Sequence, residues 1–313
     1  MALIKKFTSR FLLVLLLALS ASVLQVKELQ AKEKLLVVTS FSILQDMTQQ
    51  VAGNRAEVVS LVGPNEDAHV YQPKPSDSRK LAKADLVIEN GLEFKGWMNR
   101  LVAASEYKGL RVIATQGIAA NRMVEDDHHD HDHAEHQHGE FDPHAWQSLV
   151  EAQQYVRNIR DGLIQVDPVG KAYYKEQADA YIAKLQALHQ AMKKRFDRLP
   201  VGQRTVMTPH AAFGYLTSTY GLVFVSPQGV STTSEPSASE MAHLVKQIRL
   251  EQVAAIFLEN TGDPRLVEQL KRETKAKIGG TLYSDALSEA NGPAASYLDM
   301  MQHNLETILS ALE

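Results

Sequence analysis

The chain has 313 residues, of which 44% are hydrophobic and 22% are charged, and its formal net charge is −4. This length predicts two domains, and a charge this close to balance provides no basic field for binding nucleic acid or an anionic membrane. Cysteine is absent. Its absence excludes disulfides, thiolate metal sites, cysteine nucleophiles and lipid attachment through an N-terminal cysteine.

The first 31 residues are typical of a secretory signal peptide. Lys5, Lys6 and Arg10 precede an apolar run at residues 11–19, and small residues follow the run. The run is too short to cross a bilayer, which takes about 20 residues. We expect cleavage between residues 20 and 31, leaving a periplasmic protein that is not lipid-anchored.

Short β-branched runs alternate with amphipathic stretches along the rest of the chain. They lie at residues 35–39, 56–62, 85–88, 111–114, 204–207, 222–225, 254–258 and 276–281. Buried strands that alternate with helices predict parallel sheets. The predicted fold class is therefore α/β, with two lobes that each hold a four-stranded parallel sheet flanked by helices. We expect the N-terminal lobe at residues 32–166 and the C-terminal lobe at residues 200–313.

A long helix is predicted between the lobes, at residues 167–199. Asp167 and Pro168 resemble a helix cap and a first-turn proline, and residues 171–199 contain neither proline nor glycine. One apolar stripe is expected to follow Tyr173, Ala180, Ile182, Leu185, Leu188, Met192 and Phe196. A continuous helix of this length predicts a rigid connector that limits hinge motion.

Residues 125–140 form an insert of low complexity. This segment contains seven carboxylates and six histidines, His128, His129, His131, His133, His136 and His138. It has almost no apolar surface to bury, so a surface loop without fixed structure is expected. Many interchangeable ligands without fixed geometry predict weak, rapidly exchanging metal capture; the alternative is a solvated insert without function.

The remaining chemistry points to histidine, because no nucleophile-elbow, Walker or dinucleotide-binding motif is present. His69, His144 and His210 each follow a predicted strand, and Asp285 follows the last one. Such positions lie at the carboxyl edge of a parallel sheet, where open α/β folds bind ligands. The other histidines outside the insert, His189, His243 and His303, fall on predicted helices and are not expected to be ligands.

Three imidazoles and one carboxylate suit a tetrahedral divalent ion such as zinc. Four protein ligands leave no open position for a reacting water, which favours carriage of the metal over catalysis. Nearby acids can orient a ligating imidazole through its second nitrogen. Asp67, Asp142 and Glu259 are equal candidates for this role.

These residues resemble the substrate-binding proteins of metal-ion ABC transporters, the zinc and manganese group (cluster A-I). The similarity extends over essentially the whole mature chain through segments 63–71, 142–146, 210–215, 229–239, 259–264 and 280–288. It implies two lobes joined by one long helix, with His69, His144, His210 and Asp285 as metal ligands. It also identifies residues 125–140 as the histidine-rich loop of zinc members. Manganese members tend to carry glutamate at the position of His210, so the resemblance favours zinc.

The sequence therefore predicts a monomeric, periplasmic protein without catalytic residues, which binds zinc and delivers it to an ABC permease in the inner membrane. Manganese carriage at the same site is one alternative. An exported zinc-dependent hydrolase is another, with Glu66 or Glu259 as its general base. A metal-linked adhesin or chaperone is the third, and it predicts normal zinc uptake when the gene is removed.

Overall fold

The computed structural model describes residues 34–94, 96–122, 140–227, 232, 238–250, 253–274 and 276–313. The signal peptide and the histidine-rich insert predicted from the sequence lie outside these residues, apart from Glu140. Residues 35–313 group as one unit, which contains two four-stranded parallel sheets with the strand orders β2-β1-β3-β4 and β6-β5-β7-β8. The predicted fold class is confirmed.

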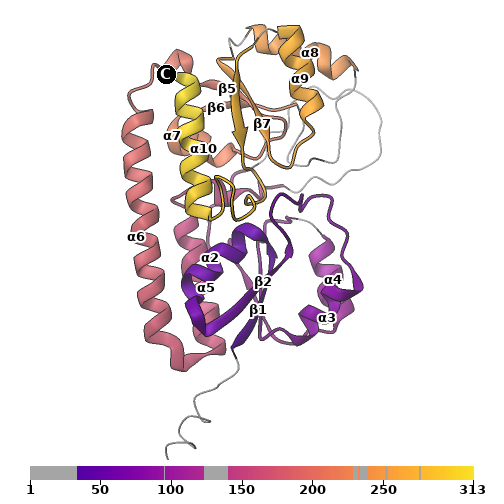
Figure 1. The fold of residues 1–313 in the computed structure, drawn as a ribbon, viewed down its shortest axis with the longest axis vertical. Coiled ribbons are helices and arrows are strands. Elements are labelled where there is room, and N and C mark those ends of the chain that lie inside the picture. Colours follow the sequence, from indigo (N-terminus) through magenta and orange to yellow (C-terminus); the bar gives the residue numbers. More distant parts are fainter. Residues whose placement is uncertain are drawn as a thin grey trace, which may run out of the picture. The chain divides into compact units, whose positions relative to one another are not determined.

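The first sheet is built from strands of largely β-branched and aliphatic residues; β1 and β3, inside the sheet, are mostly buried, and the edge strand β4 is only partly buried. Its strands are β1 (Leu35–Phe41), β2 (Ala56–Val62), β3 (Leu86–Glu89) and β4 (Leu110–Ile113). Helices α2 (Ser42–Ala52) and α5 (Ala152–Val166) cover one face, and α3 (Pro75–Lys83) and α4 (Trp97–Ser105) cover the other (Figure 1).

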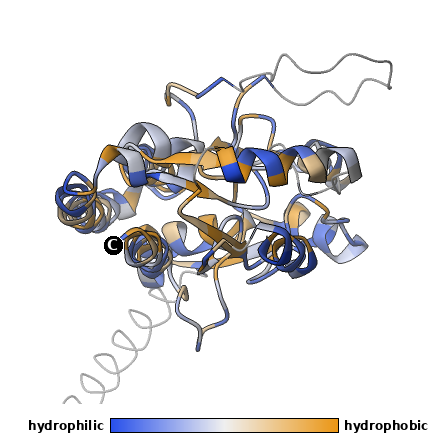
Figure 2. Ribbon diagram, turned by 90° about the horizontal axis from the view of Figure 1, so that it is seen from above, coloured by the Kyte–Doolittle hydropathy of each residue, from blue (hydrophilic) through white to orange (hydrophobic). Residues whose placement is uncertain are grey.

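The second sheet repeats this arrangement with shorter strands. Its strands are β5 (Thr205–Met207), β6 (Val223–Val225), β7 (Ala255–Glu259) and β8 (Ile278–Leu282). Helices α7 (Gly214–Tyr220) and α10 (Tyr297–Leu312) contact β6 and β8, and α8 (Ala238–Leu250) packs on α9 (Pro264–Thr274), which contacts β7. In Figure 2, hydrophobic residues gather in the strands and hydrophilic residues on the outer sides of the helices.

In the sequence between the two sheets, the chain forms α6 (Lys171–Phe196), a helix of 26 residues. A short 3-10 turn, η3 (Pro168–Gly170), precedes it, so the regular helix begins after Gly170. Helix α6 contacts α2 and α5 beside the first sheet and α7 and α10 beside the second. It therefore links both halves, as the sequence predicts, and its rigidity stays a prediction.

The apolar stripe predicted for α6 is wrong in part. Leu185, Met192 and Phe196 are buried as expected, but Ala180 is exposed, and Tyr173, Ile182 and Leu188 are only partly buried. The other buried positions are Tyr174, Ala178 and Tyr181. The buried positions recur at steps of three, four and seven residues, so they lie on one face of α6. A single stripe is therefore present, but Tyr173 and Ala180 lie beside it, one residue before the buried Tyr174 and Tyr181.

One hydrophobic cluster extends from the first sheet through α6 and α10 into the second half. A smaller cluster lies between the second sheet and helices α8 and α9. Continuity of the larger cluster explains why residues 35–313 form one unit. Among the described residues, no helix has both the length and the apolar character needed to cross a membrane.

Candidate metal centre

Four ligand side chains far apart in the sequence meet at the carboxyl ends of the strands. His69 follows β2, and His144 precedes η2 (Ala145–Gln147), a 3-10 turn after β4. His210 follows β5 and Asp285 follows β8. One ligand atom from each residue lies within 4.8 Å of the others. The four strand ends therefore converge, and the role of these residues as metal ligands stays a prediction.

The separations match the edges of a coordination polyhedron. Asp285 Oδ2 lies 3.1 Å from His210 Nε2 and 3.4 Å from His69 Nε2, and Asp285 Oδ1 lies 3.5 Å from His144 Nε2. The Nε2 atoms of His69 and His144 are 3.4 Å apart. Metal–ligand bonds of about 2.0–2.1 Å place neighbouring ligands of a tetrahedron about 3.3 Å apart. All four side chains are at most 1% exposed.

Buried carboxylates hold two of the three imidazole rings. Asp142 Oδ1 accepts the backbone N–H of His144 at 2.9 Å and lies 2.7 Å from its ring Nδ1. Glu259 Oε1 accepts the backbone N–H of His210 at 3.0 Å, and Glu259 Oε2 pairs with the ring Nδ1. These carboxylates fix each ring so that Nε2 points to the centre, as acids beside metal-bound histidines do.

Asp67 does not serve the third ring. Its Oδ1 accepts the backbone N–H of His69 at 2.6 Å, and its Oδ2 accepts the hydroxyl of Thr232 at 2.5 Å. The buried Nδ1 of His69 has no hydrogen-bond partner among the described residues. Asp142 and Glu259 therefore orient imidazole rings. Asp67, the third candidate, contacts the backbone of His69 and not its ring.

Charge and burial set the protonation of the site. Burial lowers the pKa of His69, and the charge of Asp285 offsets this effect only in part. Burial also opposes the charged form of His210, but Glu259 and Asp285 outweigh it and raise the pKa of His210 well above its usual range. The pKa of Asp285 lies well below its usual range, because His210 and His69 outweigh the effect of burial.

Metal binding is expected to release a proton from His210, because a ligating imidazole must give up its Nε2 proton. The raised pKa means that the metal-free site carries this proton at neutral pH, so affinity should rise with pH. Asp285 is already ionised and releases none. Calorimetric titration in buffers of different ionisation enthalpy should detect about one proton per ion from this residue at neutral pH. An affinity that stays constant between about pH 6 and 8 would contradict this expectation.

Asn90, which was not identified from the sequence, follows β3 and holds the segment before His144. Its side-chain N–H donates to the Pro143 carbonyl at 2.9 Å, and its Oδ1 accepts the Tyr155 hydroxyl at 2.7 Å. Both interactions are buried. An asparagine after a strand is also typical of an ordinary turn, so the sequence carries no signal for this role.

The other histidines lie away from the centre, as predicted. His189 Nδ1 is 3.3 Å from the Tyr220 hydroxyl, His303 Nε2 is 3.0 Å from the Thr281 carbonyl, and His243 is exposed on α8. The histidines proposed for weak capture, His128 to His138, lie outside the described residues.

Comparison with known proteins agrees with the fold and the site. The family model described as "Zinc-uptake complex component A periplasmic" (ZnuA) matches residues 37–311. The iron-binding protein YfeA of Yersinia pestis is 32% identical over 276 residues, which cover 88% of this chain and 86% of YfeA. The manganese-binding lipoprotein MntA of Halalkalibacterium halodurans is 32% identical over 281 residues, covering 90% of this chain and 89% of MntA. The periplasmic zinc-binding protein TroA of Treponema pallidum is 29% identical with a TM-score of 0.80, covering 89% of this chain and 99% of TroA.

Binding proteins of this kind present an ion to a transporter and are not enzymes, so the hydrolase alternative is wrong. Both acids suggested as its general base have other partners. Glu66 accepts the backbone N–H of Gly63 at 2.8 Å, and Glu259 holds His210. The chain belongs to the ZnuA/TroA family of extracytoplasmic proteins that bind divalent metal ions for uptake by ABC transporters.

Proposed function

We propose that this protein binds one zinc ion through His69, His144, His210 and Asp285 in the periplasm and delivers it to an inner-membrane ABC permease. The observation that carries the proposal is the convergence of three Nε2 atoms on a buried carboxylate. Three nitrogen donors and one oxygen donor suit zinc better than a harder ion. Separations of 3.1–3.5 Å between neighbouring donors also fit zinc–ligand bond lengths.

Manganese is the second candidate cargo, and one feature of the site favours it. Both oxygens of Asp285 face imidazole nitrogens, Oδ2 facing His69 and His210 and Oδ1 facing His144. A carboxylate in this position can bind through two oxygens and raise the coordination number above four, which suits manganese better than zinc. The name of the relative MntA also supports this candidate.

Metal analysis and competition titration of the purified metal-free protein test the choice, together with His210→Glu. We expect the parent protein to bind zinc more tightly than manganese. In the variant, the affinity for zinc should fall by about 10–100-fold relative to that for manganese, because an oxygen replaces a nitrogen donor. His303→Glu is the matched control, since this histidine lies on α10 outside the cluster. Preferential manganese binding by the parent protein would overturn the assignment to zinc.

The proposed location rests on the N-terminal segment and on composition. A basic start and a short apolar run support cleavage between residues 20 and 31. Unlike the relative MntA, which is named a lipoprotein, this sequence contains no cysteine that could carry a lipid. We also propose the division into lobes at residues 32–166 and 200–313, with the connector between them, and a monomeric state.

The histidine-rich insert is proposed as an auxiliary site that collects metal weakly. A variant that lacks residues 125–140 should still bind one ion tightly, while the total number of zinc ions bound at high concentration falls. Equilibrium dialysis over a range of zinc concentrations measures both quantities. Loss of the tight site in this variant would contradict the proposed division of roles.

A further inference from the structure

The enclosed metal centre has one side that is held less firmly than the others. No ligand side chain is more than 1% exposed, so an ion cannot enter or leave unless a covering group moves. The rings of His144 and His210 are each held by a buried carboxylate at Nδ1. The ring of His69 has no such partner among the described residues.

Phe94 covers this less firmly held side. Its ring meets the His69 ring edge-on at a centroid distance of 5.0 Å, and lies 6.1 Å from that of His144. It also packs on Phe41 and Trp146, which are fully buried, whereas Phe94 is only partly buried. Phe94 therefore lies at the outer border of the aromatic cluster around the site.

The backbone that carries Phe94 is strained. Gly91, Leu92 and Glu93 have φ values of 93°, 51° and 55°, so three successive residues adopt left-handed conformations. Leucine and glutamate rarely adopt them, because Cβ then approaches the following carbonyl oxygen. A change of the turn that returns Leu92 and Glu93 to negative φ would release this strain and offset part of the cost of moving Phe94.

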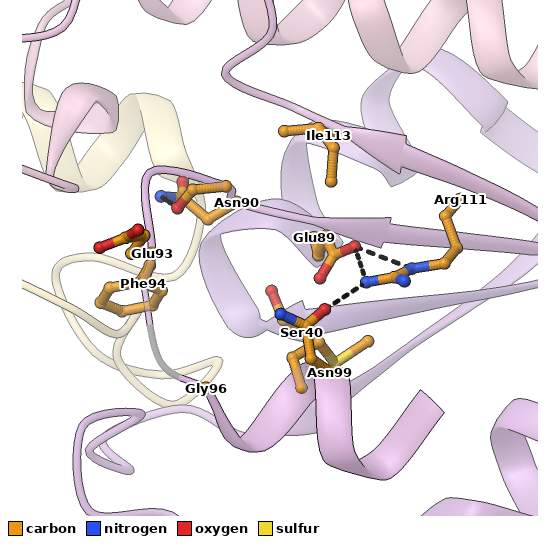
Figure 3. A pocket seen from close by; sticks show the side chains of 11 residues that line it. Ser40, Glu89, Asn90, Glu93, Phe94, Gly96, Asn99, Arg111 and Ile113 are labelled. Atoms are coloured by element: carbon orange, nitrogen blue, oxygen red, sulfur yellow. Dashed lines mark hydrogen bonds and ion pairs between the residues drawn. The ribbon is translucent and has the colours of Figure 1, made fainter. Parts of the chain in front are cut away.

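A pocket of about 410 Å³ lies beside the turn and gives Phe94 room to move. Ser40, Glu89, Asn99 and Arg111 are among its lining residues, and Phe94 lies across the pocket from Arg111 in Figure 3. Arg111 is fixed by Glu89 and Asn99. The Ser40 hydroxyl is buried and has no hydrogen-bond partner among the described residues, so replacing this side chain breaks no hydrogen bond in that part of the structure.

We infer that metal enters and leaves on the His69 side of the site: Phe94 swings into this pocket, and His69 is the first ligand to release the ion. This inference rests on the proposed metal-binding function. The other three ligands, His144, His210 and Asp285, keep the ion until His69 has moved. Buried carboxylates hold the two rings. The segment of Asp285 is held separately, because the carbonyl of the preceding residue, Ser284, accepts the Trp146 indole N–H at 2.8 Å.

Two substitutions with opposite expected effects test the route. Phe94→Leu removes part of the cover and should raise both the association and the dissociation rate of zinc by about tenfold, with little change in Kd. Ser40→Leu occupies part of the pocket beside Phe94 and should lower both rates by about tenfold. Phe224→Leu is the control, because Phe224 is a partly buried phenylalanine of β6 that packs on Phe213. Stopped-flow mixing with a fluorescent zinc chelator measures the rates.

Nuclear magnetic resonance of the histidine ring nitrogens in the zinc-loaded protein identifies the first ligand to leave. Relaxation dispersion should show exchange at His69 and none at His144 or His210. Exchange at either of those rings, or rates in both pocket variants equal to those of Phe224→Leu, would overturn the inference. If the parent protein binds no zinc or manganese tightly, the proposed function itself fails; tight binding with unchanged rates refutes only this route.

Discussion

Replacing Asp285 by asparagine is expected to weaken zinc binding by about 10²–10³-fold. Binding free energies of roughly 10–16 kcal/mol for four-ligand zinc sites correspond to about 2.5–4 kcal/mol per ligand, and the amide keeps the shape while it removes the charge. The substitution also leaves the protonated His210 with Glu259 as its remaining carboxylate partner. Competition titration with a chelator of known affinity measures the loss.

Asp263→Asn is the matched control for this experiment. Asp263 lies in the same half of the molecule, is exposed and pairs with Arg265 instead of an imidazole. Its substitution should leave zinc affinity unchanged. If Asp285→Asn and Asp263→Asn bind zinc equally well, Asp285 is not a ligand, and the assignment of the metal centre is wrong.

Replacing Trp146 by alanine is expected to lower the free energy of unfolding by about 3–5 kcal/mol. The indole is fully buried, and its ring packs on Phe41 and Phe94 at centroid distances of 4.9 and 5.0 Å. Its N–H also donates to the Ser284 carbonyl at 2.8 Å. This hydrogen bond joins a residue two positions after His144 to the residue directly before Asp285. Denaturant titration of the metal-free protein measures the loss.

Trp146→Phe separates packing from the hydrogen bond. This variant keeps an aromatic ring in the cluster but loses the interaction with Ser284, so about 1–2 kcal/mol of stability should be lost. Zinc affinity should fall by about tenfold, because the positions of His144 and Asp285 are less firmly coupled. Val169→Ala, at a position that is 87% exposed, should change neither quantity. Equal stability of Trp146→Ala and the parent protein would contradict the role of this side chain.

The eight strands illustrate what local sequence predicts well. Each short β-branched run is a strand in the structure, within one or two residues at either end. Strand ends then identify the four ligand residues, because parallel strands expose their carboxyl ends at one edge. Only the assembled sheets, however, show that His69 and His144 follow the edge strands β2 and β4 while His210 follows the inner strand β5.

By itself, the sequence determined the α/β class, the linking helix and the residues that meet at the metal centre, since hydrophobic periodicity and strand ends are local properties. The tertiary structure alone decided which acids orient the imidazoles, that Asn90 holds the segment before His144, and which residues form the buried stripe of α6. Asp67 and Asp142 both lie two residues before a ligating histidine, yet only Asp142 reaches a ring. The physical reason is that the partner of a carboxylate depends on the groups that other elements bring within hydrogen-bond distance. For Asp67, the second carboxylate oxygen accepts the hydroxyl of Thr232 instead of a ring N–H.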